Sequence, residues 1–235
     1  MAQSALLNSL DEVRAALKDE DYERLDAELD AYQAAYQESL LTERLTLRRS
    51  QLSRTEMDIS SETQTILTEY ENQQGGTNTA RAGLLAGGDI LLFDPESADS
   101  SELVGGVSDL RNQETALNDR MTAARGAISD FDLPARIALL SAEPETRSPV
   151  FGSMVSIDVT VANIGDASAE NVSLSVESSL PVSPSETTLG SVVAEETETV
   201  SVAVTANEPG EHEVTFTAKT TNADTESVSA SITVL

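Results

Sequence analysis

The chain has 235 residues, enough for one large or two modest domains, and carries 41 acidic against 14 basic side chains, a net charge of −27. A chain this acidic, with only 3% aromatic residues, lacks the basic face and the stacking groups that nucleic-acid binding requires, so that class is excluded. Because cysteine is absent, disulfides, thiolate metal sites and cysteine nucleophiles are excluded too.

The charge excess is spread along the whole chain. The segment 1–140 holds 26 acidic and 12 basic side chains, the segment 141–235 holds 15 and 2, and lysine occurs only at Lys18 and Lys219. Such a surface repels itself in dilute salt, whereas molar salt shortens the Debye length to about 3 Å. This composition resembles that of proteins from extremely halophilic archaea; an ordinary acidic protein is the alternative.

The sequence shows neither a secretion signal nor a membrane span. Residues 1–4 contain no basic segment followed by an apolar one, and no stretch approaches 18 apolar residues. We therefore expect the protein to be cytoplasmic before assembly, and afterwards to lie in a virion or at an extracellular surface.

The sequence before Gly75-Gly76 indicates two helices. A short one through about Lys18 has one apolar side, formed by Leu6, Leu10, Val13 and Leu17. Asp19 or Asp21 is expected to cap a longer second helix that ends at Gly75-Gly76, where two glycines favour a C-cap. Within the second helix a seven-residue repeat typical of coiled coils is formed by Leu45, Leu52, Ile59 and Ile66.

A further helix is predicted over 103–128. Its stripe steps alternately by four and three residues, and seven of its eight positions are apolar: Leu103, Val107, Leu110, Glu114, Leu117, Met121, Ala124 and Ile128. We expect it to form an antiparallel hairpin with the preceding helix, and partner chains to cover the remaining apolar stripes. Residues 1–132 are thus predicted to be a helical or coiled-coil region for oligomerisation or docking.

The predicted connection, a Gly-rich loop over 75–100, contains the most apolar stretch of the chain, residues 83–93. An exposed apolar patch usually marks a contact site, so we predict a protein contact through Ile90, Leu91, Leu92 and Phe93. Burial of this stretch against the chain's own helices is the alternative.

Four arginines fall within eleven residues, at Arg44, Arg48, Arg49 and Arg54. One interpretation is a docking patch for an acidic partner chain, through Arg44, Arg48 and Arg49 in particular. The other is intramolecular pairing: in a hairpin that turns at 75–100, Arg44 would lie near Asp130 and Asp132. Both interpretations stay open.

The hydrophobic period changes at Asp132-Leu133-Pro134. Apolar residues alternate beyond it, for instance at Val155, Ile157, Val159 and Val161, and turn sequences separate six or seven such runs over residues 136–235. This size and pattern are typical of an immunoglobulin-like sandwich. The predicted fold class is therefore α+β in two domains, a helical hairpin or coiled coil followed by an all-β sandwich.

Several turn motifs near the C-terminal end carry a family resemblance: the alternating run into Asn163-Ile164-Gly165, then Ala169-Glu170-Asn171-Val172, Leu189-Gly190 and Pro209-Gly210-Glu211-His212-Glu213-Val214. They resemble the immunoglobulin-like domains of archaeal and bacterial surface proteins, with the cell-adhesion-related (CARDB-like) modules as the nearest type. The resemblance implies an extracellular spacer or adhesive module.

Catalytic and cofactor motifs are absent from the sequence, which has no nucleophile elbow, phosphate loop, dinucleotide fingerprint or zinc-protease motif. We interpret His212 as an isolated surface histidine. A calcium site from Asp158, Asp166 and Glu170 and glycosylation of Asn171 are weak alternatives. We expect no enzyme activity, cofactor or metal.

These observations favour a non-enzymatic structural protein of a haloarchaeal assembly with protein partners, namely a homo-oligomer or other subunits. A virion component such as a decoration, turret or tail protein fits best, with the helices docking and the sandwich projecting outward. The alternative is a cell-envelope or appendage protein, with the sandwich as adhesin or spacer.

Overall fold

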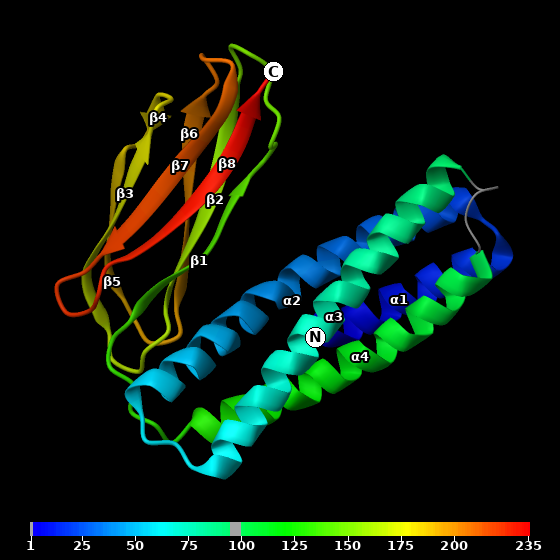
Figure 1. Cartoon of the computed structure of the whole chain (residues 1–235), viewed down its shortest axis with the longest axis horizontal. Coiled ribbons are helices and arrows are strands. Elements are labelled where there is room, and N and C mark those ends of the chain that lie inside the picture. Colours follow the sequence, from blue (N-terminus) through cyan, green and yellow to red (C-terminus); the bar gives the residue numbers. More distant parts are fainter. Residues whose placement is uncertain (1, 95–99) are drawn as a thin grey trace. The chain divides into compact units, whose positions relative to one another are not determined.

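The computed structural model describes residues 2–94 and 100–235, which form a helical unit up to residue 130 and a β unit from residue 131 onwards. In the described residues, the helical unit consists of α1 (Ala2–Asp19), α2 (Tyr22–Glu56), α3 (Ser61–Phe93) and α4 (Ser100–Ile128). Figure 1 shows these helices running alongside one another. The predicted α+β class, helices followed by an all-β sandwich, is confirmed.

At the start of the helical unit, the buried residues are those that the apolar pattern of the sequence predicts. The four leucine and valine side chains predicted to face one side of α1 are all buried. Asp21 is the N-cap of α2 and accepts a hydrogen bond from the backbone N–H of Arg24 at 3.1 Å. Ser60 caps α3 in the same way through Thr63, so the seven-residue repeat across residues 45–66 is interrupted by a turn between two helices.

Two predictions about the middle of the chain were wrong. α3 continues through Gly75-Gly76, and the segment expected as a loop over 75–100 is helical up to Phe93. Each interior glycine costs a helix about 1 kcal/mol, but the apolar and polar side chains buried on either side, from Leu67 to Leu91, stabilise α3 by more than that. α3 and α4 still form the expected antiparallel hairpin, joined by the short segment after Asp94.

Most of the apolar stripe of α4 is covered within the chain, and only Leu103 and Met121 of its apolar members are half-buried. Val107 and Leu110 belong to one core cluster with residues of α1, α2 and α3, while Leu117 and Ile128 are also fully buried. The expectation of a partner chain rested on a two-helix hairpin, which could not bury every stripe. Because four helices pack together, that argument for oligomerisation no longer holds.

The β unit is a sandwich of two four-stranded antiparallel sheets in the orders β1-β2-β6-β4 and β5-β3-β7-β8. Its strands are β1 (Ile137–Pro144), β2 (Met154–Asn163), β3 (Ala169–Ser178), β4 (Val182–Ser183), β5 (Glu186–Val192), β6 (Thr197–Thr205), β7 (Gly210–Lys219) and β8 (Glu226–Val234). Alternate side chains of both sheets form one apolar core, as the period-2 pattern predicted. The sequence pattern did not indicate β4, which lies within the predicted Pro181–Pro184 turn, or β5, which follows it.

Hydrogen bonds and close packing explain the sequence of the turn after β2. The buried Asn163 amide donates to the carbonyls of Ala167 and Val192, at 2.8 and 2.9 Å, and its oxygen accepts from Gly165 N–H at 3.1 Å. A Cβ at Gly165 would lie only 1.8 Å from the carbonyl oxygen of Pro134, so no larger residue fits. The motif thus fastens the start of the sandwich to the end of β2.

Candidate functional site

The helical unit contains a buried polar cluster around Arg81 of α3. Its side chain is only 2% exposed, and its guanidinium makes two bidentate pairs. Nε and Nη2 donate to Glu114 of α4, both at 2.6 Å, and Nη1 and Nη2 donate to Glu43 of α2, at 2.9 and 2.8 Å. Nη1 also donates to Asn78 at 3.0 Å. All five N–H groups of Arg81 are therefore used, and one side chain ties three helices together.

Three tyrosines surround this cluster. The Tyr32 hydroxyl donates to Glu114 at 3.2 Å, the Tyr70 hydroxyl donates to the carbonyl of Glu43 at 2.8 Å, and the Tyr36 ring centroid lies 4.3 Å from Arg81 Cζ. The last distance fits a cation–π contact. Tyr32 and Tyr70 thus find acceptors in the cluster, so neither of these buried hydroxyls lacks a hydrogen bond.

The electrostatics of the cluster favour the charged arginine. Burial by itself lowers the pKa of Arg81, but the hydrogen bonds and negative charges of Glu43 and Glu114 raise it above its ordinary value. Burial, followed by the charge of Glu114, raises the pKa of Tyr32 well above its usual range; burial and the charge of Glu43 act on the pKa of Tyr70 in the same direction. Every N–H group of Arg81 has an acceptor, and its ion pairs with Glu43 and Glu114 can hold α2, α3 and α4 in register.

Sequence reasoning missed this cluster, although one signal for it was present. Glu114 is the single charged member of the otherwise apolar stripe on α4. A buried carboxylate in such a position requires a cation or a donor from a neighbouring helix. The sequence alone does not identify that partner, because Arg81 lies on a different helix and is far from Glu114 along the chain.

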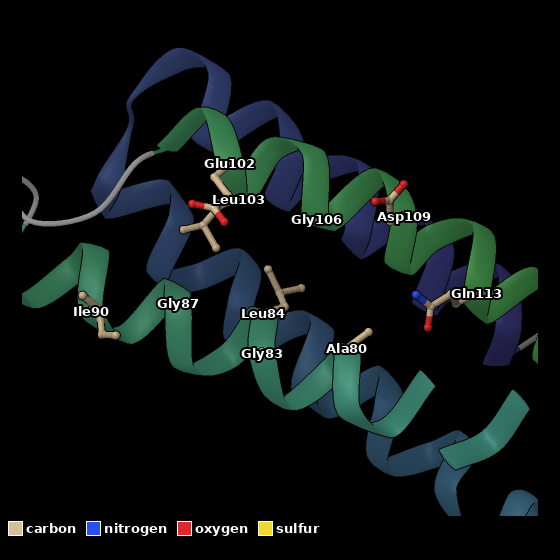
Figure 2. A pocket seen from close by; sticks show the side chains of 10 residues that line it. All are labelled: Ala80, Gly83, Leu84, Gly87, Ile90, Glu102, Leu103, Gly106, Asp109 and Gln113. Atoms are coloured by element: carbon tan, nitrogen blue, oxygen red, sulfur yellow. The ribbon is translucent and has the colours of Figure 1, made fainter. Parts of the chain in front are cut away.

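A second feature is a groove between α3 and α4, with a volume of about 490 Å³, which we call the α3–α4 groove. It is lined by Ala80, Gly83, Leu84, Gly87, Ile90, Glu102, Leu103, Gly106, Asp109 and Gln113. Figure 2 shows the side chains of Leu84 and Leu103 pointing into the space between the two helices. The groove is therefore apolar at its base and carries acidic residues only on the α4 side.

Glycines shape this groove. At Gly87 a Cβ would meet Leu103 Cδ2 at 2.6 Å, so this glycine allows α3 and α4 to pack closely. At Gly83 and Gly106 a Cβ would meet nothing within 4 Å. The latter two glycines therefore cost the helices about 1 kcal/mol each relative to alanine, without being required by any described neighbour.

The predicted contact segment, residues 90–93, lies at the end of α3, and its four side chains differ in exposure. Leu91 is fully buried and Leu92 packs against the core, whereas Ile90 is 54% exposed and Phe93 is 93% exposed. In a helix, side chains three residues apart share a face, so Ile90 and Phe93 point outward together while Leu91 points inward. The expectation that all four are exposed in a loop was wrong; a contact through Ile90 and Phe93 stays a prediction.

We expect Leu91→Ser and Phe93→Ser to have very different effects. Leu91→Ser should lower the free energy of unfolding by about 2–5 kcal/mol, because it leaves a cavity in the core. Phe93→Ser should change it by no more than about 0.5 kcal/mol, because its ring is in water. Urea unfolding followed by circular dichroism measures both, and equal effects would show that the assignment of inward and outward faces is wrong.

The arginine cluster is also divided between environments. Arg49 is buried, Arg44 is partly buried and Arg48 is exposed. Arg54 pairs with Glu71 of α3 at 3.0 Å and donates to Thr68 at 3.1 Å, so intramolecular pairing holds for this member. A docking role for Arg44, Arg48 and Arg49 stays a prediction.

The suggested pairing of Arg44 with Asp130 was wrong. Glu43 lies level with Glu114, where both bind Arg81, and α4 continues from there to Ile128, roughly 20 Å further at about 1.5 Å per residue. Asp130 follows beyond that point, whereas Asp132 belongs to the β unit, and its pairing with Arg44 stays a prediction. The error arose because the turn was placed at residues 75–100, whereas α2 and α3 already turn at residues 57–60.

Comparison with known proteins identifies the sandwich. The CARDB family model matches residues 138–230, which span β1 to most of β8. Residues 138–230 are a CARDB domain. This confirms the resemblance seen in the turn motifs; the helical unit lies outside the match, and no curated protein matches the chain.

Solved structures similar to this chain include a CARDB domain from Pyrococcus furiosus in complex with di-metal ions, with 13% identity, covering 45% of this chain and 91% of that chain, at a TM-score of 0.34. Alpha-2-macroglobulin from Escherichia coli is similar at 14% identity, covering 45% of this chain and 17% of that one, at a TM-score of 0.39. A human complex of zinc 2-glycoprotein and prolactin-inducible protein gives 11% identity, 45% and 99% coverage, and a TM-score of 0.36. The family assignment rests on the matched residues 138–230.

The CARDB domain does not bring its candidate site residues together. His212 is buried, with 8% exposure, and does not lie at the surface as the sequence interpretation expects. Its Nδ1 shares a hydrogen bond with the Ser179 hydroxyl at 2.9 Å, and its Nε2 donates to the Glu208 carbonyl at 2.8 Å. The carboxylate of Asp166 accepts from the backbone of Leu133. Among the described residues, no three His, Asp or Glu side chains are placed to share a metal ion.

The remaining sequence predictions concern the surface of the chain. Asn171, the potential glycosylation site, is exposed and donates to Thr221 at 3.2 Å. Its glycosylation stays an untested alternative. Within the described residues, none of the helices is both long and apolar enough to cross a membrane.

Proposed function

We propose that this protein is a non-enzymatic structural subunit of a high-salt assembly, in which the helical unit docks to partner subunits and the CARDB domain is the outward module. The observation that carries the proposal is the combination of a CARDB domain, an immunoglobulin-like fold found in surface proteins, with a separately folded bundle of helices. Immunoglobulin-like domains commonly serve protein contacts, and the bundle offers a groove and exposed apolar side chains for docking.

Within this proposal, a virion component of a haloarchaeal system, such as a decoration, turret or tail protein, is the first candidate. Its support is the net charge of −27, shared by both units, which suits a surface held in molar salt. The protein would be cytoplasmic before assembly and exposed on the particle afterwards.

The second candidate is a cell-envelope or appendage protein with the CARDB domain as adhesin or spacer. One observation favours it specifically, because CARDB domains are found in surface proteins. In both candidates the helical unit docks to partner subunits and the CARDB domain is the outward module.

Immunogold labelling of native particles and of whole cells, with antibodies raised against the sandwich, tests the proposal. We expect label on the outside of one of them: label on particles supports the virion component, and label on cells supports the envelope protein. Label confined to the soluble cytoplasmic fraction would refute both candidates.

A further inference from the structure

The α3–α4 groove has the features of a binding surface open to solvent. Gly83, Ile90 and Gly106 line it and are exposed, while the buried Leu84 closes it from beneath. Since nothing lies within 4 Å of a Cβ at Gly83 or at Gly106, the backbones of both helices are accessible from the groove. Glycine allows the closest approach of another backbone or side chain.

The charges along the groove restrict what can occupy it. Glu102 and Asp109 lie seven residues apart on α4, and thus on the same side of that helix, and both line the groove. Among its described lining residues there is no lysine, arginine or histidine. A basic occupant would find complementary charge there, whereas an acidic one would be repelled.

This charge pattern argues against a second copy of the chain as occupant. The segment 1–140 carries 26 acidic against 12 basic side chains, and several of those bases already serve intramolecular pairs, such as Arg81, Arg54 and Arg111. Pairing two such surfaces would bring acidic groups into contact, where partly buried charges are screened by salt much less than exposed ones are. The groove therefore suits a partner of opposite charge.

We propose that the α3–α4 groove binds an amphipathic helix of a different protein, one with basic residues flanking its apolar face. The apolar side chains of that helix, spaced by three and four residues, lie over Leu84, Leu103 and Ile90, and its basic residues pair with Glu102 and Asp109. This assignment rests on the proposed docking function and names the class of partner and the surface that receives it.

The probe is a synthetic helical peptide of about five turns with leucines at three- and four-residue spacing flanked by lysines, compared with the same peptide carrying glutamates. Titration of the full chain by fluorescence anisotropy measures the affinity. The blocking variant is Gly106→Leu, which fills the groove, and the matched control is Gly105→Leu, next to it and also exposed, with open space at its Cβ but outside the groove. Both variants keep the charge, so unspecific attraction of a basic peptide affects them equally.

We expect the lysine peptide to bind wild type and Gly105→Leu alike, Gly106→Leu to bind at least about tenfold more weakly, and the double variant Glu102→Gln, Asp109→Asn to lose much of the affinity. No saturable binding, equal binding by Gly106→Leu, or equal binding of the glutamate peptide would overturn the proposal. So would a wild-type dimer in sedimentation equilibrium that Gly106→Leu dissociates, because the occupant would then be a second copy.

A separate measurement distinguishes this proposal from the function on which it rests. If Gly106→Leu enters the native assembly as efficiently as wild type does, docking occurs elsewhere and the groove assignment fails, although the structural function stands. If the wild type itself is absent from the assembly, the structural function fails. Loss of incorporation by Gly106→Leu, but not by Gly105→Leu, supports the groove as the docking site.

Discussion

Replacing Arg81 by methionine is expected to lower the free energy of unfolding by about 3–5 kcal/mol, the usual cost of breaking a buried ion pair. The variant would leave Glu43 and Glu114 facing each other without a cation, in a place where their side chains are no more than 4% exposed. Methionine fills much of the same space, so the loss would come from uncompensated charge rather than from a cavity. Urea unfolding in molar salt, followed by circular dichroism, measures it.

Two further variants show whether burial of charge is the cause. Arg120→Met removes an arginine from an exposed pair with Glu69 on the same helix hairpin and should cost no more than about 1 kcal/mol. Adding Glu43→Gln and Glu114→Gln to Arg81→Met removes all three charges but keeps an acceptor for the Tyr32 hydroxyl. This triple variant should regain a large part of the loss, because no unpaired charge remains buried.

Two outcomes would contradict this account of the polar cluster. If Arg81→Met and Arg120→Met lose the same stability, the buried network contributes no more than a surface pair does. If the triple variant is even less stable than Arg81→Met, the carboxylates are stabilised by something other than Arg81. Either result would also weaken the inference that Arg81 sets the register of α2, α3 and α4.

The sandwich could be predicted well from sequence because its information is local. Alternation along a single strand decides which face of that strand is buried, and turns such as Asn163-Ile164-Gly165 mark where strands end. β4 and β5 escaped detection for the same reason. β4 has only two residues, and β5, over Glu186–Val192, exposes or half-exposes most of its side chains, so neither has a clear alternation.

The helical unit could be predicted only where the packing agrees with the local signals. The apolar side of α1 and the cap at Asp21 are local and were found. The sequence indicates a helix end at Gly75-Gly76, because the helix propensity of two glycines is unfavourable. Their cost is small beside the burial of Tyr70 and Leu84 on the same helix, and that burial depends on α2 and α4, which are distant in sequence.

The candidate site was predicted least well, since both of its parts arise from helix pairing. The α3–α4 groove needs Gly83 and Gly106 to face the same space, and they belong to two different helices that run antiparallel. A helix that ends at Gly75 predicts neither the groove nor the position of Arg81, since both need α3 beyond that residue. The apolarity of residues 83–93 is evident from the sequence, but the burial of Leu91 and the exposure of Phe93 follow only from the helix.

Lowering the salt concentration from about 1 M to about 0.1 M is expected to unfold or strongly destabilise the chain. Two like charges about 10 Å apart in water repel by about 0.4 kcal/mol unscreened, of which screening leaves roughly 0.15 kcal/mol at about 0.1 M and about tenfold less at about 1 M. With an excess of 27 negative charges, several tens of such neighbour pairs add up to several kcal/mol. That is comparable with the whole stability of a typical domain, about 5–15 kcal/mol.

The measurement is circular dichroism and melting temperature of the full chain across that range, with the helical signal reporting on residues 2–128 and tryptic cleavage on both units. Salt also strengthens apolar burial, so a control with sucrose at equal osmolality and about 0.1 M salt is needed. Screening predicts that sucrose restores little of the structure, while potassium chloride and sodium chloride act alike. A spectrum and melting temperature that stay constant over the whole range would show that the acidic surface is not an adaptation to high salt, and the proposed high-salt assembly would lose its main support.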